Sequence, residues 1–301
     1  MPIFTLPKND SRDEIVVKTE KKLGSGSYGI VYEILFNSIP SALKIVKKDK
    51  SDDGIREEIE LIQYLIKNYP DCNVDNILCY TDISEDDENI YFVSDLMKMD
   101  LEKFIRSSEY KKLPFSKKIN IIWDITNQTI RGIDALHKIG VIHRDIKLPN
   151  ILINKKGNKY TVKISDFGLS CIIQRCDGFS GTPINLPPDI TFGKNIKWTP
   201  EADLYSFGVA LYRLLTHKYL NTAQNLIEYE NRNLSGKELL DEYMKVYDRK
   251  MNSLNNIRDK LSKSRSSVKS KYDKLVSVVK ELTYPKYKKK ITATDVIKML
   301  K

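Results

Sequence analysis

The chain has 301 residues and a formal net charge of +10, and this length accommodates one large domain or two. No apolar run approaches the roughly eighteen residues of a membrane span, and the N-terminus lacks the charged and then apolar pattern of a signal peptide, which argues against a secreted or membrane-spanning protein. The four cysteines lack the paired spacing of a zinc site and suggest no disulfide framework, so we expect an intracellular, cytoplasmic protein in a reducing compartment.

The N-terminal part predicts two strands joined by a glycine-rich loop. Residues 1–12 are expected to form a flexible arm, and strand-like runs follow at 15–19 and 31–36. The loop between them has the pattern G-x-G-x-x-G-x-V. Because it joins two strands, it is typical of a flexible lid over phosphates rather than of a dinucleotide-binding turn, and a plain tight turn is the alternative. Its residues are Leu23, Gly24, Ser25, Gly26, Ser27, Tyr28, Gly29, Ile30 and Val31.

A third strand at residues 42–46 carries a single charge, Lys44, inside an apolar run. A solvated lysine on an edge strand is one interpretation. The other is an ammonium group that reaches the α- and β-phosphates of a nucleotide. A helix predicted at residues 55–66 can present Glu58 to this lysine, with Glu57 second by register.

The strongest signal is the run His-Arg-Asp-Ile-Lys-Leu-Pro-Asn at residues 143–150, followed by Asp-Phe-Gly at residues 166–168. In phosphoryl transfer an Asp accepts the proton of a substrate hydroxyl, while an Asn and a second Asp hold Mg²⁺ at the phosphates of ATP. Asp145, Asn150 and Asp166 fit these three roles. Either motif alone would be modest support, but their order and context are specific.

A β-hairpin is predicted between the two motifs. Apolar residues at 151–153 and alternating residues at 160–164 flank a polar turn that contains a glycine. We expect this hairpin to hold Asn150 and Asp166 near one another, so that both reach the metals bound to phosphate.

These motifs closely resemble those of the eukaryotic-type protein kinase superfamily, and the resemblance runs from about Val16 to the C-terminus. It implies an α+β fold of two lobes within one kinase domain at residues 13–301. The small β-rich N-lobe would cover residues 13–97 and the larger helical C-lobe residues 98–301. It also implies ATP and Mg²⁺ as cofactors and protein substrates as partners.

The resemblance extends to the substrate side of the site. Lys147, with Thr182 opposite it in a Gly-Thr-Pro segment, is the arrangement of Ser/Thr kinases. Asp203 resembles the Asp of a buried helix that hydrogen-bonds the catalytic loop. Catalytic roles are therefore implied for Asp145, Lys147, Lys44 and Glu58.

The segment joining the lobes resembles an adenine-binding hinge. The resemblance implies that the carbonyl of Asp95 and the backbone of Met97 bind adenine, and that Asp100 faces the ribose.

The activation segment lacks a hydroxyl at Gly178, where many members of the family carry a phosphorylated Thr. The carboxylate of Asp177 beside it can give Arg144, and also Arg175, a permanent partner and order the loop without phosphorylation. An exposed turn Asp is the equally weighted alternative.

The excess charge lies at the C-terminus, where residues 237–301 contain eighteen Lys and Arg against eight Asp and Glu. Within 237–282, apolar residues recur every seven positions, which predicts one or two amphipathic helices with a break at 262–267. A helical pair with a solvated lysine face is the favoured interpretation. A docking surface for an acidic partner, a polyanion or an anionic membrane is the sharper one, and a coiled coil is a third.

The sequence therefore predicts a serine/threonine protein kinase in which Asp145 orients a Ser or Thr hydroxyl toward the γ-phosphoryl group of Mg-ATP. A kinase acting on a small molecule is a weaker enzymatic alternative. A pseudokinase or scaffold acting through its basic C-terminal helices is the alternative from another class, and the presence of Lys44, Asp145, Asn150 and Asp166 argues against it.

Overall fold

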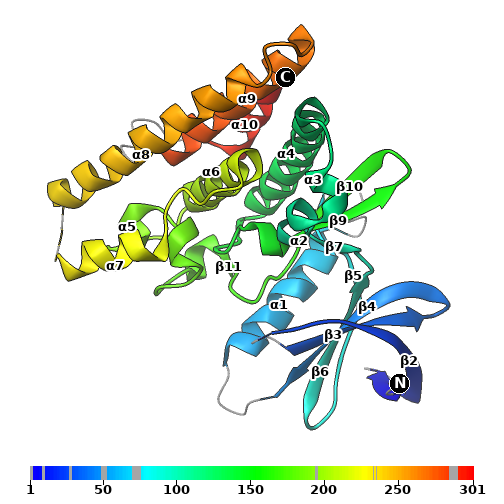
Figure 1. The fold of residues 1–301 in the computed structure, drawn as a ribbon. Coiled ribbons are helices and arrows are strands. Elements are labelled where there is room, and N and C mark those ends of the chain that lie inside the picture. The colour runs from blue at the N-terminus through cyan, green and yellow to red at the C-terminus, as the bar shows by residue number, and fades with distance from the viewer. Residues whose placement is uncertain are drawn as a thin grey trace. The chain divides into compact units, whose positions relative to one another are not determined.

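The computed structural model describes residues 3–8, 11–26, 29–48, 53–69, 76–193, 196–232, 234, 236–284 and 291–301. They form two compact units (Figure 1). Unit 1 comprises residues 1–98 with 165–168, and unit 2 comprises residues 99–164 with 169–301. Unit 1 is mostly sheet and unit 2 mostly helix, which confirms the predicted α+β fold of two lobes. The short segment 165–168 belongs to unit 1, although the sequence places it far beyond the first lobe.

Unit 1 is built on a six-stranded sheet in which every neighbouring pair is antiparallel, in the order β1-β2-β3-β4-β6-β5. Its strands are β1 Ile3–Lys8, β2 Ser11–Gly26, β3 Gly29–Phe36, β4 Ile39–Lys47, β5 Tyr80–Glu85 and β6 Asn89–Asp95. The structure thus differs from the flexible arm expected at residues 1–12. The reason is that backbone groups of β1 find hydrogen-bonding partners in β2.

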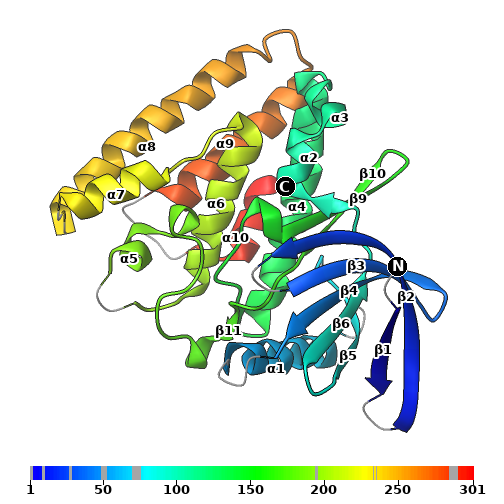
Figure 2. The same ribbon diagram turned by 60° about the horizontal axis from the view of Figure 1, so that its bottom comes forward.

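Helix α1 (Asp53–Asn68) covers one face of this sheet, as Figure 2 shows. Side chains of β6 alternate between the two faces, as the period of a strand requires. Ile90 and Phe92 pack with Ile62 of α1. Tyr91 and Val93 point the other way and pack with Leu43 and other residues of β3 and β4. This alternation fixes the register of β4, and therefore the face on which Lys44 lies.

Unit 2 contains nine α-helices among its described residues. They are α2 Leu101–Arg106, α3 Ser108–Lys111, α4 Phe115–Lys138, α5 Pro188–Thr191, α6 Pro200–Thr216, α7 Ala223–Asn231, α8 Gly236–Asp259, α9 Ser266–Thr283 and α10 Ala293–Leu300. Its short strands are β7 Met99–Asp100, β8 Val141–Ile142, β9 Ile151–Lys156, β10 Lys159–Ile164 and β11 Cys171–Ile172. Strands β9 and β10 form the predicted hairpin, and β11 pairs with β8.

Helix α6 forms the centre of unit 2, because it is buried on all sides rather than along one stripe. Gly208 lies where α6 meets α9. A Cβ atom at this position would lie 2.7 Å from Cγ2 of Thr283 and 2.8 Å from Cβ of Leu282. The absence of a side chain therefore sets how closely the two helices approach.

The basic C-terminal region folds as two helices, α8 and α9, with a break at residues 260–265 that overlaps the predicted break at 262–267. Leu254, Leu261 and Leu275 from the seven-residue repeat are at most 1% exposed. The hydroxyl of Tyr247 donates to the carbonyl of Lys280 at 3.0 Å and ties the two helices together. The apolar repeat of α8 and α9 is thus buried inside unit 2. It is therefore not available as the surface of a coiled coil. Within the described residues, no helix has both the length and the apolarity to cross a bilayer.

We predict that Gly208→Ala lowers the free energy of unfolding of unit 2 by about 1–3 kcal/mol, because the added methyl group forces α6 and α9 apart. Ser277→Ala, at an exposed position of α9, is the control and should change it by less than about 0.5 kcal/mol. Chemical denaturation monitored by fluorescence measures both. Equal stability of the two variants would contradict the proposed close approach of the helices.

Candidate active site

Lys44 of β4 lies in a cluster of charges within unit 1. Its Nζ is 2.8 Å from Oε1 of Glu58 in α1 and 4.0 Å from Oδ1 of Asp166. Glu58 is 5% exposed and lies on the buried stripe of α1 with Leu61, whereas Glu57 is exposed. Helical register thus brings Glu58, the first choice from sequence, to the lysine.

The Asp-Phe-Gly segment is anchored in unit 1 by its phenylalanine. The ring of Phe167 is fully buried and contacts the ring of Tyr80 edge-on, with centroids 6.3 Å apart. Burial, followed by the carboxylates of Glu58 and Asp166, raises the pKa of Tyr80 well above its ordinary value. Asp166 itself has φ = 67°, a left-handed conformation that costs a non-glycine residue about 1–3 kcal/mol. The buried ring beside it holds the carboxylate in this conformation.

The glycine-rich loop closes the hairpin of β2 and β3. Leu23, Gly24, Ser25 and Gly26 end β2, and Gly29, Ile30 and Val31 begin β3, with Gly26 opposite Gly29. Ser27 and Tyr28, also predicted to contact the nucleotide, lie outside the described residues.

Two glycines of this loop differ in their surroundings. Gly29 has φ = 113°, and a Cβ atom there would lie 2.2 Å from the carbonyl oxygen of Ile45, so no other residue fits. At Gly24 a Cβ atom would meet nothing within 4 Å. The space beside Gly24 allows another group to approach the backbone.

Asp145 is the centre of a hydrogen-bonded cluster in unit 2. Its Oδ1 accepts from the hydroxyl of Thr182 at 2.7 Å, and its Oδ2 lies 2.7 Å from Nζ of Lys147. Lys147 also donates to the Thr182 hydroxyl at 2.9 Å. Nδ2 of Asn150 donates to both Oδ2 and the carbonyl oxygen of Asp145, at 2.9 and 3.0 Å. The structure thus brings together three of the predicted residues and Thr182 around one carboxylate.

Asp203 of α6 holds the chain that carries Asp145. It is 1% exposed, and its carboxylate accepts the backbone N–H groups of His143 at 2.8 Å and Arg144 at 2.9 Å. Nε2 of His137, at the end of α4, is 2.9 Å from the same carboxylate. Burial alone would raise the pKa of Asp203, but the hydrogen bond from His137 and the neighbouring histidines outweigh it and leave the pKa below its usual value. Sequence reasoning identified Asp203 but did not single out His137.

Arg144 connects the catalytic loop to the activation segment. It has φ = 64°, and its side chain donates to the carbonyl oxygens of Leu169 and Asp177, the latter at 3.2 Å. The prediction of a carboxylate partner is therefore corrected. The guanidinium reaches the backbone of Asp177, whose side chain is exposed. The guanidinium also lies 5.6 Å from the ring centroid of Trp198, whose Nε1 donates to the carbonyl oxygen of Gly178 at 2.9 Å.

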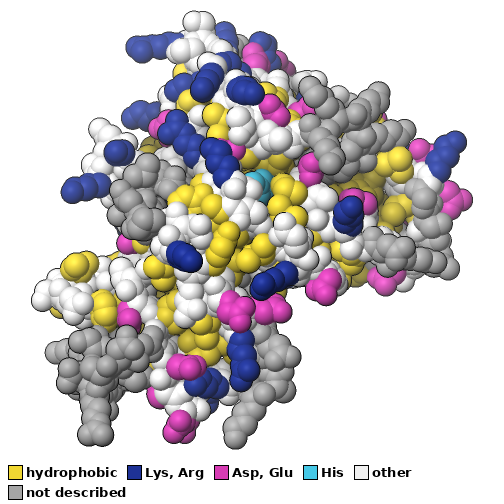
Figure 3. Space-filling model, turned by 180° about the vertical axis from the view of Figure 1, so that it is seen from behind, with side chains coloured by type: hydrophobic (Ala, Val, Ile, Leu, Met, Phe, Trp, Pro, Cys, Tyr) yellow, Lys and Arg dark blue, Asp and Glu magenta, His cyan; other side chains and the backbone are white. Residues whose placement is uncertain are grey.

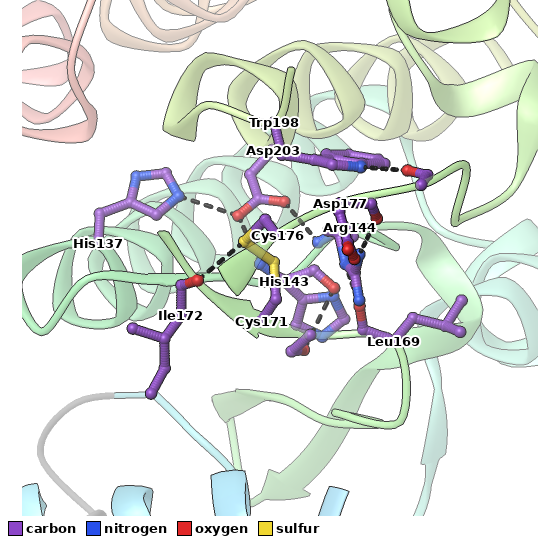
Figure 4. Close-up of a disulfide and its surroundings, with 12 residues drawn as sticks. His137, His143, Arg144, Leu169, Cys171, Ile172, Cys176, Asp177, Trp198 and Asp203 are labelled. Carbon is purple, nitrogen blue, oxygen red and sulfur yellow. Dashed lines mark hydrogen bonds and ion pairs between the residues drawn. A yellow bond between two sulfur atoms is a disulfide. The ribbon is translucent and has the colours of Figure 1, made fainter. Parts of the chain in front are cut away.

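Sequence reasoning missed the disulfide between Cys171 and Cys176, which lies beside these contacts (Figure 4). Cys79 in unit 1 is also disulfide-bonded. The expectation of no disulfide is therefore wrong. The spacing of the cysteines carried no signal, because their proximity arises from the pairing of Cys171 with β8 and the return of the chain through residues 173–175.

The predicted hinge residues fall on both sides of the division between units. Asp95 ends β6, and Met97 is 8% exposed. Asp100 caps helix α2, since its Oδ1 accepts the backbone N–H of Lys103 at 2.7 Å and its Oδ2 lies 3.0 Å from Nζ of Lys103. The sequence did not anticipate this structural role for Asp100.

Comparison with known proteins decides the family. The sequence profile of the protein kinase domain matches residues 17–300. The chain belongs to the protein kinase family. Members of this family use ATP and Mg²⁺. The described residues contain no group of three or more His, Cys, Asp or Glu side chains that can hold a metal.

Individual relatives are similar over about two thirds of this chain. The dual specificity protein kinase shkE of Dictyostelium discoideum is 34% identical over 66% of the chain and 27% of its own length. NUAK family SNF1-like kinase 1 of Mus musculus is 32% identical over 65% of the chain and 29% of its own length. The serine/threonine-protein kinase STK11 of Rattus norvegicus is 28% identical over 69% and 49%. The chain spans about a quarter to a half of the length of these kinases.

We predict that Asp203→Asn flattens the acid dependence of stability. The folded pKa of Asp203 lies below the unfolded value of about 3.9, so the ionised carboxylate stabilises the fold above that pH, and the stabilisation is lost as pH falls through the folded pKa. The difference in free energy of unfolding between wild type and Asp203→Asn should therefore narrow from about pH 6 to about pH 3.

Urea denaturation across this pH range measures the difference. Asp248→Asn, at an exposed position of α8, is the control and should follow the wild-type curve. A gap between wild type and Asp203→Asn that stays constant with pH would show that the low pKa is not a property of this carboxylate.

Proposed function

We propose that this chain is an active protein kinase that transfers the γ-phosphoryl group of ATP to Ser or Thr hydroxyls of protein substrates. The observation that carries the proposal is the position of the Thr182 hydroxyl, which donates to Asp145 and accepts from Lys147. A substrate hydroxyl needs the same two partners: a carboxylate that takes its proton and a cation beside the developing charge.

The residues of unit 1 suit the binding of a nucleotide. In this role Lys44, fixed by Glu58, contacts the α- and β-phosphates, and the backbone at Gly24 approaches the phosphates without a side chain in the way. Asp166 keeps 33% of its side chain exposed, so its oxygens can accept a hard cation. Bound Mg²⁺ would neutralise phosphate charge and orient the γ-phosphoryl group.

Asn150 has the matching role in unit 2. Its Nδ2 is engaged by Asp145, which fixes the plane of the amide and gives Oδ1 to the metal in the proposed arrangement. The same bonds position the carboxylate of Asp145 for proton transfer. Loss of Asn150 would therefore affect both metal binding and the base.

The preference for Ser and Thr over Tyr is a separate part of the proposal. Lys147 and Thr182 form a hydrogen bond across the site, and a short aliphatic hydroxyl can take the place of Thr182 near Asp145. Since the similar kinase shkE is named as dual specificity, matched peptides with Ser, Thr or Tyr as the only acceptor test this preference directly.

We predict that Asp145→Asn lowers the turnover number by about 10²–10⁴, because the amide keeps the shape of the side chain but cannot take a proton. ATP affinity, measured by calorimetry or by thermal shift with Mg-ATP, should stay within about threefold of wild type, since no charge at the phosphates changes. Asp248→Asn, the same substitution at an exposed position, serves as the control.

Retention of more than about a tenth of the wild-type turnover by Asp145→Asn would remove this residue as the base. Binding of ATP by the wild type without transfer to any of a broad set of acceptor proteins would favour the pseudokinase alternative. Transfer to a small molecule but to no protein would favour the other enzymatic alternative.

We also propose that the turn between α8 and α9 binds an acidic partner or polyanion. Three basic side chains of this turn, Lys260, Lys263 and Arg265, are exposed, and Figure 3 shows Lys and Arg side chains gathered at this end of the molecule. The next two lysines are engaged internally: Lys269 donates to the carbonyl of Ser262 at 2.7 Å and Lys271 to Oδ1 of Asn120 at 2.9 Å.

We predict that replacing Lys260, Lys263 and Arg265 together by Gln weakens binding to heparin at low salt, while folding and transfer to a short peptide stay near wild type. Replacing Lys269 and Lys271 by Gln is the control with two charges removed, and it should weaken heparin binding less. The difference should disappear at high salt, because exposed charges more than about 8 Å apart are screened near physiological ionic strength. Unchanged heparin affinity in the triple variant would mean that these charged side chains are only solvated by water and bind no polyanion.

A further inference from the structure

The disulfide joins two points of the activation segment that differ in how firmly they are held. Cys171 is 8% exposed, pairs with Ile142 of β8 and packs in a core cluster with Leu186 and Trp198. Cys176 is half-buried at the margin of this cluster. The Cα atoms of the two cysteines lie 5.4 Å apart, within the usual range for a disulfide. The covalent bond thus attaches a peripheral residue to a fixed one.

The residues directly after Cys176 carry the contacts that lead to the catalytic carboxylate. The carbonyl oxygens of Asp177 and Gly178 accept from Arg144 and Trp198. Three residues further on, Gly181 has φ = 94°, and a Cβ atom there would lie 2.3 Å from the carbonyl oxygen of Arg144. Thr182 then bonds Asp145. The residues between the disulfide and Asp145 are therefore held mainly by hydrogen bonds to their backbone.

Cys176 is half-buried, and its exposed neighbours allow an external reagent to approach it. Ile173, Gln174 and Arg175 precede it and Asp177, Gly178 and Phe179 follow it, and all six residues are exposed. Sγ of Cys176 lies 3.2 Å from the carbonyl oxygen of Ile172, so a thiol at this position has an acceptor within reach. After reduction, the thiol of Cys176 therefore still has a hydrogen-bonding partner.

We propose that Cys171–Cys176 is a site of thiol–disulfide exchange whose oxidised form orders residues 176–182 for binding of the protein substrate. Its co-substrate is a dithiol reductant. One thiolate of the dithiol attacks Sγ of Cys176, the bond to Cys171 breaks, and Sγ of Cys171 leaves as a thiolate and takes a proton. The second thiol of the reductant then attacks the reductant's first sulfur, which is bonded to Sγ of Cys176 in the mixed disulfide. This step releases Cys176 as a thiol and the reductant as a cyclic disulfide.

The effect on substrate binding follows from the shortness of the loop. Opening it returns conformational freedom to residues 172–176. Because residues 176–182 follow directly, they lose a fixed starting point, and the cost of ordering them is then met when the substrate binds. The inference rests on the proposed kinase activity for its consequence. The exchange itself and the order of the segment can be measured without any phosphoryl transfer.

The experiment compares the full chain purified without reductant and the same protein after treatment with dithiothreitol. Differential alkylation and mass spectrometry should find Cys171 and Cys176 linked before treatment and alkylated after it. Trypsin cleavage after Arg175 should become at least about threefold faster on reduction, as expected when an ordered loop opens locally. Cleavage after Lys263, in the turn between α8 and α9, should not change and serves as the internal control.

The kinetic arm tests the consequence. Reduction should raise the KM for a peptide substrate by about threefold to tenfold, with little change in the KM for ATP. The double variant Cys171→Ser, Cys176→Ser should resemble the reduced wild type and lose this response to dithiothreitol. Any response that remains in the double variant belongs to the disulfide of Cys79, so the difference between the two proteins isolates the proposed site.

Free thiols at Cys171 and Cys176 in protein purified without reductant would overturn the inference, and so would equal cleavage after Arg175 in the two redox states. An unchanged KM for the peptide in an active, fully reduced enzyme would overturn the proposed effect on substrate binding. Faster cleavage on reduction in a protein without kinase activity would support the exchange site while rejecting the proposed function.

Discussion

The buried carboxylate of Asp203 is the interaction on which the geometry of the site depends. It accepts two consecutive backbone N–H groups, from His143 and Arg144, just before the residue that carries the proposed base. Arg144 has a left-handed backbone conformation, and such strain persists only where the surroundings compensate for it. Because α6 is buried on all sides, Asp203 is fixed by the core of unit 2. The position of Asp145 is therefore set by the packing of a helix rather than by the loop itself.

Both carboxylate oxygens of Asp145 have hydrogen-bonding partners within the protein. Thr182 donates to the carboxylate, Lys147 lies against it, and Asn150 holds its second oxygen. In the proposed function, a substrate hydroxyl therefore displaces Thr182 from the carboxylate or shares it. This exchange of one hydroxyl for another costs little, since the hydrogen bond lost is replaced by one of the same kind.

The sequence predicted what depends on local periodicity and on motifs, and it missed what depends on tertiary packing. Glu58 could be chosen over Glu57 because the buried stripe of a helix repeats at known spacing, and Lys44 because it is the single charge inside an apolar run. The bond between His137 and Asp203 joins residues 66 positions apart, and that between Trp198 and Gly178 joins residues 20 apart. No sequence pattern predicts either pair. The pairing of β1 with β2 was missed for a related reason, since a short segment near the N-terminus gives no sign of its partner strand.

The contacts that hold the activation segment recognise the main chain. Arg144 and Trp198 bind carbonyl oxygens of Asp177 and Gly178, while the side chains of Asp177 and Phe179 are exposed. Substitutions at positions 177 and 179 can therefore accumulate without loosening the segment. The order of the segment therefore does not depend on which side chains stand at these two positions. The exposed side chains at these two positions can diverge during evolution, while the backbone that carries them keeps the same conformation.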